Sequence, residues 1–372
     1  MHRVLLLGAF LMLLPSPALA AAKAPAFEVS GWIPYWRVAS GTAEALSHIE
    51  HFNALMPFGY VVQNDGTLHD AFGFSATSST STAKMLVAAA KAAGVKVVPT
   101  VMWSNGQAMH SVLRSTRSRI ALEDRIAALV KENGFDGIDI DFESKLLQTR
   151  PYFSLFLEGL YARMGKKFVY CAIEPRTPPS SAFSVIPEKL QYVNDYAVIN
   201  KYCDRVEIMT YDQGATDLRL NAAANGTPYI PVSDPKWAQK VITLASGFIS
   251  KNKIVIGIPT YGYEYEVVPL TQGYRYNLQW AFNPGYATQL ARDLGITPMR
   301  NSAGEMSFTY TPTTTPQLAS AVPDPRRIVW WSDAQAINDK IQLARELGVR
   351  GVAIFKIDGG QDPNIWNVLP KK

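Results

Sequence analysis

Three carboxylic acids stand at alternate positions of one short apolar segment. Residues 134–143 read GFDGIDIDFE, so Asp139, Asp141 and Glu143 are separated by Ile140 and Phe142. Alternate side chains of a β-strand point to the same face, which would place the three acids together and the apolar side chains opposite them. Grouping carboxylates costs free energy unless they share protons, hydrogen bonds or a metal ion. Core packing would not select this arrangement, so the segment is a candidate catalytic site.

Such a row of acids could serve two kinds of chemistry, cation binding or general acid–base catalysis. No Cys or His supports a metal here, since the five histidines are at positions 2, 48, 51, 69 and 110; we expect no metal and no cofactor. As an acid, Glu143 would hold a proton because Asp141 beside it disfavours a second charge. Two acids on one strand cannot flank a sugar ring as an acid and a nucleophile do. The nucleophile would come from elsewhere, and an N-acetyl group of the substrate could supply it.

The elements that position these acids form a regular series in the sequence. Helical patterns at 83–93, 117–133, 236–250 and 334–347 lie between short apolar segments, which we predict to be strands. The predicted strands are residues 29–35, 51–60, 96–102, 137–143, 167–173, 205–211, 253–259 and 351–355. Eight such units predict an α/β fold, a (β/α)8 TIM barrel with the acids pointing inward and rising towards its C-terminal mouth. A doubly wound open sheet is disfavoured because no GxGxxG follows the first strand.

Two segments fall outside the regular series. Residues 264–325 are rich in Tyr, Thr and Pro, and we predict that they form a small α+β insertion between strand seven and the last β-α unit of a catalytic barrel spanning 21–372. Residues 1–20 combine a basic start, an apolar run too short to span a membrane comfortably, and Ala-Leu-Ala at the end. This order is typical of a secretory signal peptide, with an N-terminal membrane anchor as the alternative. We therefore expect a secreted protein, extracellular or periplasmic and associated with the cell wall.

The amino-acid composition and the net charge indicate which kinds of partner the protein is expected to bind. The 372 residues are 48% hydrophobic and 18% charged, which indicates a globular protein with a large core. Removing residues 1–20 takes away only Arg3 among the charged residues, so the net charge falls from +5 to +4. No long run of Lys or Arg occurs, which disfavours nucleic-acid binding. We expect a monomer that does not associate with a membrane once the signal peptide is cleaved.

Several segments together resemble a known family, the family 18 glycoside hydrolases, which include chitinases. DGIDIDFE at 136–143 is similar to their strand-four signature DGxDxDxE, with every position filled. Further similar segments are MTYD at 209–212 on strand six, GIPTYG at 257–262 on strand seven and GVAIF at 351–355 on strand eight. Within the family, the segments EPRT at 174–177, VWWSD at 329–333 and DPNIW at 362–366 most resemble bacterial peptidoglycan N-acetylglucosaminidases.

The resemblance implies a hydrolase of β-1,4-linked N-acetylglucosamine polymers, with peptidoglycan and chitin both open as substrates. Glu143 would protonate the glycosidic oxygen and later activate water, while the substrate's own acetamido oxygen forms an oxazolinium intermediate. Asp141 would orient the acetamido group, supported by Asp139, and Tyr211 would hydrogen-bond the acetamido carbonyl. The residues expected to contact the substrate are Asp212, Met209, Phe355, Trp36, Tyr35, Trp103 and Tyr263.

Two departures from the family pattern leave alternatives open. Phe355 stands where the family usually has a Trp under the reacting sugar, and WSNG at 103–106 replaces the Ser-x-Gly-Gly of chitinases. A Phe offers a smaller stacking surface. A non-catalytic sugar-binding protein is therefore one alternative, and a metal-dependent enzyme using Asp139 and Asp141 as ligands is another.

The two cysteines, Cys171 and Cys203, are predicted to be free and buried. Cys171 lies inside predicted strand five, and Cys203 precedes strand six. If both segments are extended, their heights differ by about five residues, or roughly 16 Å. That separation exceeds the reach of a disulfide.

Overall fold

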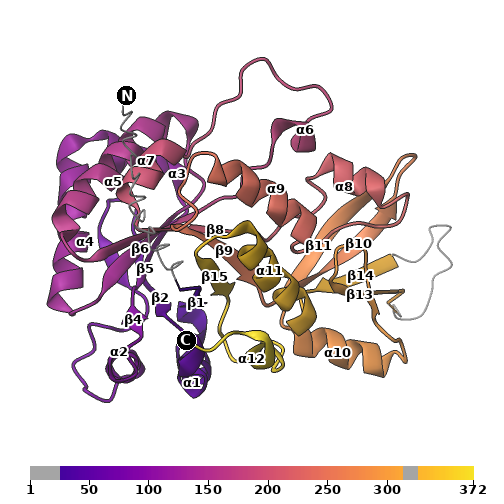
Figure 1. Ribbon diagram of the computed structural model, residues 1–372, viewed down its shortest axis with the longest axis horizontal. Coiled ribbons are helices and arrows are strands. Elements are labelled where there is room, and N and C mark those ends of the chain that lie inside the picture. The colour runs from indigo at the N-terminus through magenta and orange to yellow at the C-terminus, as the bar shows by residue number, and fades with distance from the viewer. Residues whose placement is uncertain (1–25, 313–325) are drawn as a thin grey trace, which may run out of the picture.

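The computed structural model describes residues 26–312 and 326–372, whose arrangement is shown in Figure 1. The predicted signal peptide, residues 1–20, lies outside the described residues. The described chain forms a closed parallel barrel with helices around it and a separate antiparallel sheet at one side. This architecture confirms the predicted (β/α)8 TIM barrel.

The barrel strands lie close to the predicted segments. They are β1 (Glu28–Ile33), β2 (Ala54–Val62), β4 (Lys96–Val97) with β5 (Thr100–Trp103), β6 (Gly137–Phe142), β7 (Phe168–Ile173), β8 (Arg205–Ile208), β9 (Ile254–Pro259) and β15 (Gly351–Phe355). The third position is split into β4 and β5 around Pro99, which has no N–H to donate to the ladder. β1 pairs in parallel with both β2 and β15, so the first and last strands close the barrel.

Helices cover the outside of the barrel (Figure 1). They are α1 (Val38–Ser47), α2 (Thr82–Ala92), α3 (Gly106–Arg114), α4 (Thr116–Glu132), α5 (Arg150–Met164), α7 (Tyr196–Tyr202), α9 (Pro235–Ser246) and α11 (Ala334–Leu347), with the short α6 (Pro179–Ala182), α8 (Leu218–Ala223) and α12 (Ile365–Val368). Local sequence sets the helix ends. The Ser81 hydroxyl accepts the N–H of Lys84 at the start of α2, and Gly348 ends α11 in the left-handed region with φ 64°.

The insertion forms a small sheet with one helix. Its strands are β10 (Gly262–Pro269), β11 (Tyr274–Phe282), β12 (Met299–Arg300), β13 (Met306–Tyr310) and β14 (Arg326–Trp331), with α10 (Pro284–Asp293) between β11 and β12. The strand order is β11-β10-β14-β13-β12, and each pair is antiparallel. The sheet therefore extends beyond the predicted bounds 264–325 on both sides, because β10 begins at Gly262 and β14 ends at Trp331. Residues 313–325 lie outside the described residues.

Ion pairs fasten the strands at the N-terminal end of the barrel. Glu28 on β1 accepts hydrogen bonds from Arg205 at the start of β8, at 2.5 and 2.9 Å, and from Arg350 just before β15. Burial raises the pKa of Glu28, but the hydrogen bonds from Arg205 and Arg350 outweigh it and lower that pKa to about 2. The charges thus hold together strands that are far apart in the sequence.

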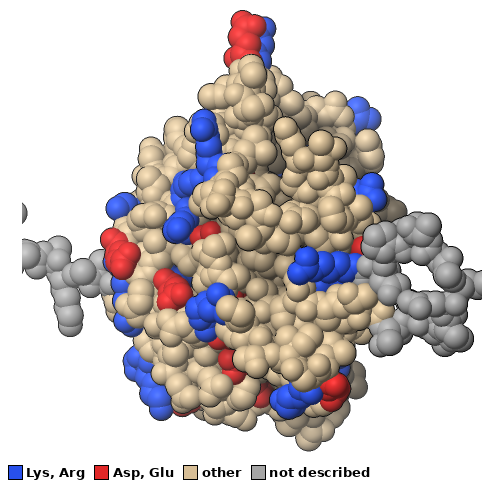
Figure 2. Space-filling model, turned by 90° about the vertical axis from the view of Figure 1, so that its right-hand side faces the viewer, with Lys and Arg blue, Asp and Glu red and all other residues tan. Residues whose placement is uncertain are grey.

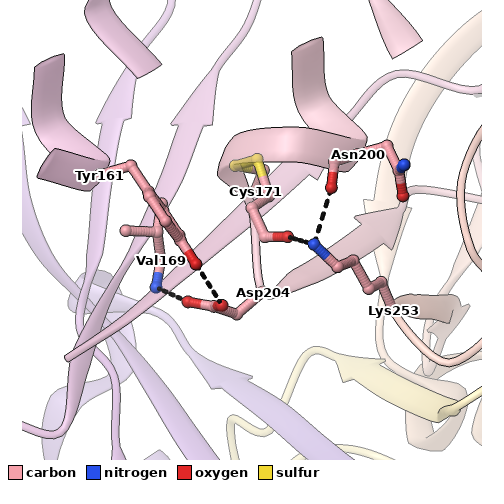
Figure 3. Close-up of a disulfide and its surroundings, with 7 residues drawn as sticks. Tyr161, Val169, Cys171, Asn200, Asp204 and Lys253 are labelled. Atoms are coloured by element: carbon pink, nitrogen blue, oxygen red, sulfur yellow. Dashed lines mark hydrogen bonds between the residues drawn. A yellow bond between two sulfur atoms is a disulfide. The ribbon is translucent and has the colours of Figure 1, made fainter. Parts of the chain in front are cut away.

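The prediction that both cysteines are free is wrong: Cys171 and Cys203 form a disulfide with their Cα atoms 6.0 Å apart (Figure 3). Cys171 points from β7 to the helix-facing side, in the same core as Cys203. Cys203 has an extended backbone (φ −117°, ψ 136°), but it caps α7 and is not part of β8. In the register of the two strands Cys171 lies opposite Val206, so the cysteines are offset by three residues and not by five. Two hydrogen bonds hold this turn against β7, from Asp204 N to Val169 O and from Val169 N to the Asp204 carboxylate. A height counted along extended strands therefore overestimated the separation.

In the part of the chain that the structure describes, no helix is long and apolar enough to cross a membrane. Figure 2 shows the face on which the small sheet lies, where blue and red side chains are interspersed among a larger neutral surface.

Candidate active site

The acids of β6 occupy the inside of the barrel, as their alternation predicts. Asp139 is fully buried, Asp141 is 4% exposed, and Glu143 lies just past the strand at intermediate exposure. Ile140 and Phe142 point the other way into the core beneath the helices. The ladder thus rises from the barrel interior to the C-terminal mouth, where active sites of this fold lie.

Asp139, the lowest acid, is held by donors from neighbouring strands. Its Oδ2 accepts hydrogen bonds from Trp32 Nε1 at 2.9 Å and from Thr100 Oγ1 at 2.8 Å. Burial raises the pKa of Asp139 to about 6, although these two hydrogen bonds oppose the rise. Trp32 is 1% exposed; it fixes Asp139 and also contributes to the lining of the pocket that contains Asp141 and Glu143.

Glu207 on β8 is a site residue that the sequence reasoning missed. Asp139 Oδ1 and Glu207 Oε2 are both buried, and neither receives a hydrogen bond from a described donor. A hydrogen bond between the two carboxyl groups contributes to the pKa values of both, and it requires a proton on one of them. Burial first, and then the charge of Asp139, raise the pKa of Glu207 well above its ordinary range. Glu207 is therefore the protonated partner of the two. The sequence could have shown that Glu207 points inward, because it stands two residues before Met209 and four before Tyr211, on the same face of the predicted strand.

The pKa values of the upper two acids are also raised. Burial, followed by the charges of Glu143 and Asp139, raises the pKa of Asp141 well above its usual range. Burial and then the charge of Glu174 raise the pKa of Glu143, while Lys145 opposes the rise. A carboxyl group whose pKa is raised in a cleft is suited to donate a proton near neutral pH. Glu143, at the open end of the ladder, has the position and the environment of a general acid.

Lys145 connects the acid strand to the loop after β7. Its side chain is enclosed, and its Nζ donates to Phe142 O and to both oxygens of Glu174, at 3.2 and 3.1 Å. Asn194 Nδ2 also donates to Glu174, at 2.7 Å. Two donors thus engage the Glu174 carboxylate, and the Lys145 ammonium balances part of the negative charge near Glu143.

The segment after β8 supplies the opposite wall. Tyr211 is buried, and its ring stacks on Phe355 with centroids 5.2 Å apart. Burial raises the pKa of the Tyr211 hydroxyl well above its usual value, so the hydroxyl is a neutral hydrogen-bond donor. The exposed Asp212 has φ 56° in the left-handed region, and its Oδ1 accepts the hydroxyls of Tyr261 and Tyr263 at 2.6 Å each. Tyr261 and Tyr263, at the start of the insertion, therefore hold the Asp212 carboxylate in place past the end of β8.

A pocket of about 330 Å³, here called the central pocket, brings most of the predicted residues together. Its lining includes Asp141, Glu143, Met209, Tyr211, Asp212, Phe355 and Trp36, joined by Glu174. Phe355 and Trp36 continue into an outer pocket of about 490 Å³ beside the small sheet, which Tyr263 also lines. Trp36 is 50% exposed, which leaves its ring available for stacking on a sugar. The two pockets form one groove across the mouth of the barrel.

Two predicted contact residues lie elsewhere. Trp103 is 2% exposed and packs against Phe142 in the core beneath the helices, because Thr100 and Met102 take the inward positions of β5. It therefore does not line the groove. Tyr35 is exposed and meets Trp36 edge-on at 5.0 Å, but it does not line either pocket.

One group of described side chains has metal-ligand spacing, and it lies away from the acids. Ligand atoms of His48, Glu50 and His51 come within 4.8 Å of one another. These residues precede β2, at the opposite end of the barrel from Glu143. Their neighbours already engage two of them, since Lys371 lies 3.3 Å from Glu50 and the His48 ring stacks on Trp366.

Known proteins with similar sequences include glycosylases of Bacillus subtilis. The chain is 23% identical to the uncharacterized glycosylase YvbX over 72% of this chain and 70% of that protein. It is 27% identical to the cortical fragment-lytic enzyme over 67% of this chain and 52% of that protein. The chain thus spans only about half the length of the latter relative.

Solved structures with the same fold include both wall-lytic and chitin-degrading enzymes. The spore cortex-lytic enzyme SleL of Bacillus megaterium matches with a TM-score of 0.71 and 22% identity, over 94% of this chain and 74% of that chain. A chitinase of Chromobacterium violaceum matches with a TM-score of 0.71 and 17% identity, over 92% of this chain and 98% of that chain.

A family model covers the barrel, its acids and the insertion together. The model for glycosyl hydrolases family 18 matches residues 35–360, which include the whole acid ladder and Phe355 at the end of the last strand. Of the described residues, the match leaves out 26–34, which include the first barrel strand, and the C-terminal residues after Gly360. The chain belongs to glycosyl hydrolases family 18, and it is a glycosidase.

Proposed function

We propose that the chain is a secreted hydrolase of β-1,4-linked N-acetylglucosamine polymers, peptidoglycan or chitin, that works by substrate-assisted retaining catalysis. The observation that carries this proposal is the proton-rich ladder Asp139-Asp141-Glu143, which ends in the central pocket opposite Tyr211. Asp141 and Glu143 follow each other on one strand, so they cannot lie on opposite faces of a sugar ring.

The other two carboxylates of the central pocket are poor candidates for a nucleophile. Glu174 is engaged by Lys145 and Asn194. Asp212 accepts two tyrosine hydroxyls on one oxygen. Hydrogen bonds of this kind stabilise the charge of a carboxylate and weaken its attack on carbon. An acetamido oxygen brought by the substrate fills the missing role.

The reaction then runs in two steps. Glu143 donates its proton to the glycosidic oxygen as that bond breaks, and the acetamido carbonyl oxygen bonds to the anomeric carbon to give an oxazolinium ion. Asp141 and Glu143 share one proton, which Glu143 holds before this step, so Asp141 is a carboxylate that accepts the acetamido N–H and stabilises the positive charge. The Tyr211 hydroxyl donates to the carbonyl oxygen. In the second step the Glu143 carboxylate takes a proton from water, whose oxygen attacks the anomeric carbon as its bond to the acetamido oxygen breaks. The acetamide is regenerated, and the anomeric carbon regains its original configuration. Asp139 holds the negative charge beneath Asp141, and the neighbouring Glu207 remains protonated.

Two features support export. The first twenty residues have the order of a signal peptide. The Cys171–Cys203 disulfide is independent support, since disulfides persist in oxidising compartments outside the cytosol.

The test is product analysis by mass spectrometry. The purified protein and its Glu143→Gln variant are incubated with peptidoglycan sacculi and with chito-oligosaccharides, and NMR follows the anomer released first. We expect cleavage with the β-anomer formed first, and a loss on the order of 100- to 10,000-fold in the variant. Retained activity in Glu143→Gln, or first release of the α-anomer, would overturn the mechanism.

A second candidate function, non-catalytic sugar binding, draws on Phe355. Its ring is the floor shared by the central and outer pockets and offers a smaller stacking face than the Trp common in the family. Binding of both polymers without cleavage of either would select this function.

A further inference from the structure

A third hollow, here called the side pocket, adjoins the central pocket. It measures about 290 Å³ and shares Glu174 and Pro175 with the central pocket. Pro179 and Ala182 of α6, together with Phe183, give it a largely apolar wall. A polymer lying in the groove at Glu143 would therefore place a neighbouring unit, or its substituent, in the side pocket.

The lining of the side pocket includes one positively charged side chain, that of Arg176. The guanidinium carbon of Arg176 lies 4.2 Å from the ring centroid of Tyr192 and 3.9 Å from that of Tyr196. Aromatic rings against the plane of a guanidinium leave its N–H groups, which point outward along the edge, available for hydrogen bonds. Arg176 Nε is buried and has no hydrogen-bond partner among the described residues.

The nearby carboxylates already have other partners. Glu174 is bound by Lys145 and Asn194. Asp195 pairs with Arg150 at 2.8 Å. Within residues 26–312 and 326–372, Arg176 has no ion-pair partner at all. The Arg176 side chain is only partly buried, so the terminal N–H groups of its guanidinium can bind a carboxylate from a ligand with a strong, charge-assisted bond.

The shape and charge of the side pocket fit a substituent that combines a carboxylate with short apolar groups. Of the two candidate polymers, chitin carries no carboxylate. Peptidoglycan carries one on the lactyl ether of every muramic acid, beside a methyl group, or on the peptide attached there. We propose that Arg176 binds a carboxylate of a muramic acid unit next to the cleaved bond, so that peptidoglycan is preferred over chitin. This inference rests on the proposed hydrolase function.

The test compares kcat/KM on three substrates: peptidoglycan glycan stripped of peptide, the same glycan with its peptides intact, and chito-oligosaccharides. Arg176→Met is compared with Arg219→Met, which removes one positive charge from exposed α8 beside the same wall, where Arg219 Nε lies 3.4 Å from Ser180 O. We expect Arg176→Met to lose about 10- to 100-fold on at least one peptidoglycan substrate, through KM, and to match the wild type on chito-oligosaccharides. Loss on the stripped glycan assigns the lactyl carboxylate, and loss on the intact glycan alone assigns the peptide.

A second measurement needs no variant. The lactyl carboxylates of the stripped glycan are converted to methyl amides. If these carboxylates are the ligand, the conversion should lower kcat/KM of the wild type by the same factor as Arg176→Met does. The peptide carboxylates of the intact glycan are blocked and tested in the same way. Equal activity on blocked and free substrates, or equal losses of Arg176→Met on chito-oligosaccharides and peptidoglycan, would overturn the assignment. Absence of cleavage of every substrate by the wild type would instead count against the proposed hydrolase.

Discussion

Asp139 and Glu207 lie inside the barrel as two buried carboxyl groups from different strands; burial, followed by the charge of Asp139, raises the pKa of Glu207 well above its ordinary range. Trp32 and Thr100 donate to Oδ2 of Asp139, while Ser30 donates to Glu207 at 3.2 Å. A protonated Glu207 beside an ionised Asp139 avoids two adjacent charges beneath Asp141.

Replacing Glu207 should separate its proton-donating role from its size. In Glu207→Gln the amide can still donate to Asp139, whereas in Glu207→Met, of similar length, Asp139 Oδ1 has no partner. An unsatisfied buried acceptor costs about 1–3 kcal/mol. We expect Glu207→Met to be less stable than Glu207→Gln by that amount in urea unfolding at pH 7. Equal stability of the two variants would show that no proton links the pair.

The pH dependence of activity should respond to Lys145. Its positive charge lowers the pKa of Glu143, against the rise caused by burial and by Glu174. Lys145→Met should therefore raise that pKa, and the alkaline limb of kcat/KM, where Glu143 loses its proton, should move to higher pH. A limb that stays in place or moves to lower pH would contradict Glu143 as the acid that Lys145 controls. Far-ultraviolet circular dichroism checks that the variant is folded.

The disulfide should contribute to stability by limiting the unfolded chain. Closing a loop over a sequence separation of 32 residues is worth about 3–4 kcal/mol in the chain-entropy model. We expect reductant, or the paired change Cys171→Ala with Cys203→Ala, to lower the melting temperature. Thiol titration of the denatured, non-reduced protein should detect no free thiol, and detection of both thiols would show that the bond does not form.

Glu28 should make stability depend on pH at the acid end. Its folded-state pKa of about 2 lies below the ordinary 4.5, so its contribution is present in full above the unfolded-state pKa and is lost as pH falls through the folded value. The shift corresponds to about 3 kcal/mol. Glu28→Gln should lower the free energy of unfolding at pH 7, and its difference from the wild type should shrink by pH 3. A difference independent of pH would show that the ion pairs with Arg205 and Arg350 contribute no linkage.

The sequence predicted the barrel because short apolar segments alternate with helical patterns, and it predicted the acid ladder because of period-two alternation along a single strand. The same rule, applied to 100–103, would have placed Trp103 beneath the helices, and applied to 205–211 it would have turned Glu207 inward. Cys203 could not be placed in this way. Its position depends on how α7 turns into β8, which is a matter of packing between layers and not of local pattern. The contacts of Asp212 likewise depend on where the insertion lies against the barrel.

The closure of β1 between β2 and β15 makes the order of synthesis matter for folding. Until residues 351–355 emerge, β1 and β9 each expose an unpaired edge, and exposed edges invite association with other chains. Every other barrel strand can pair with a neighbour made shortly before it. The last strand therefore completes the sheet. A chain truncated before Gly351 would leave the barrel open, with an unpaired edge on β1 and another on β9.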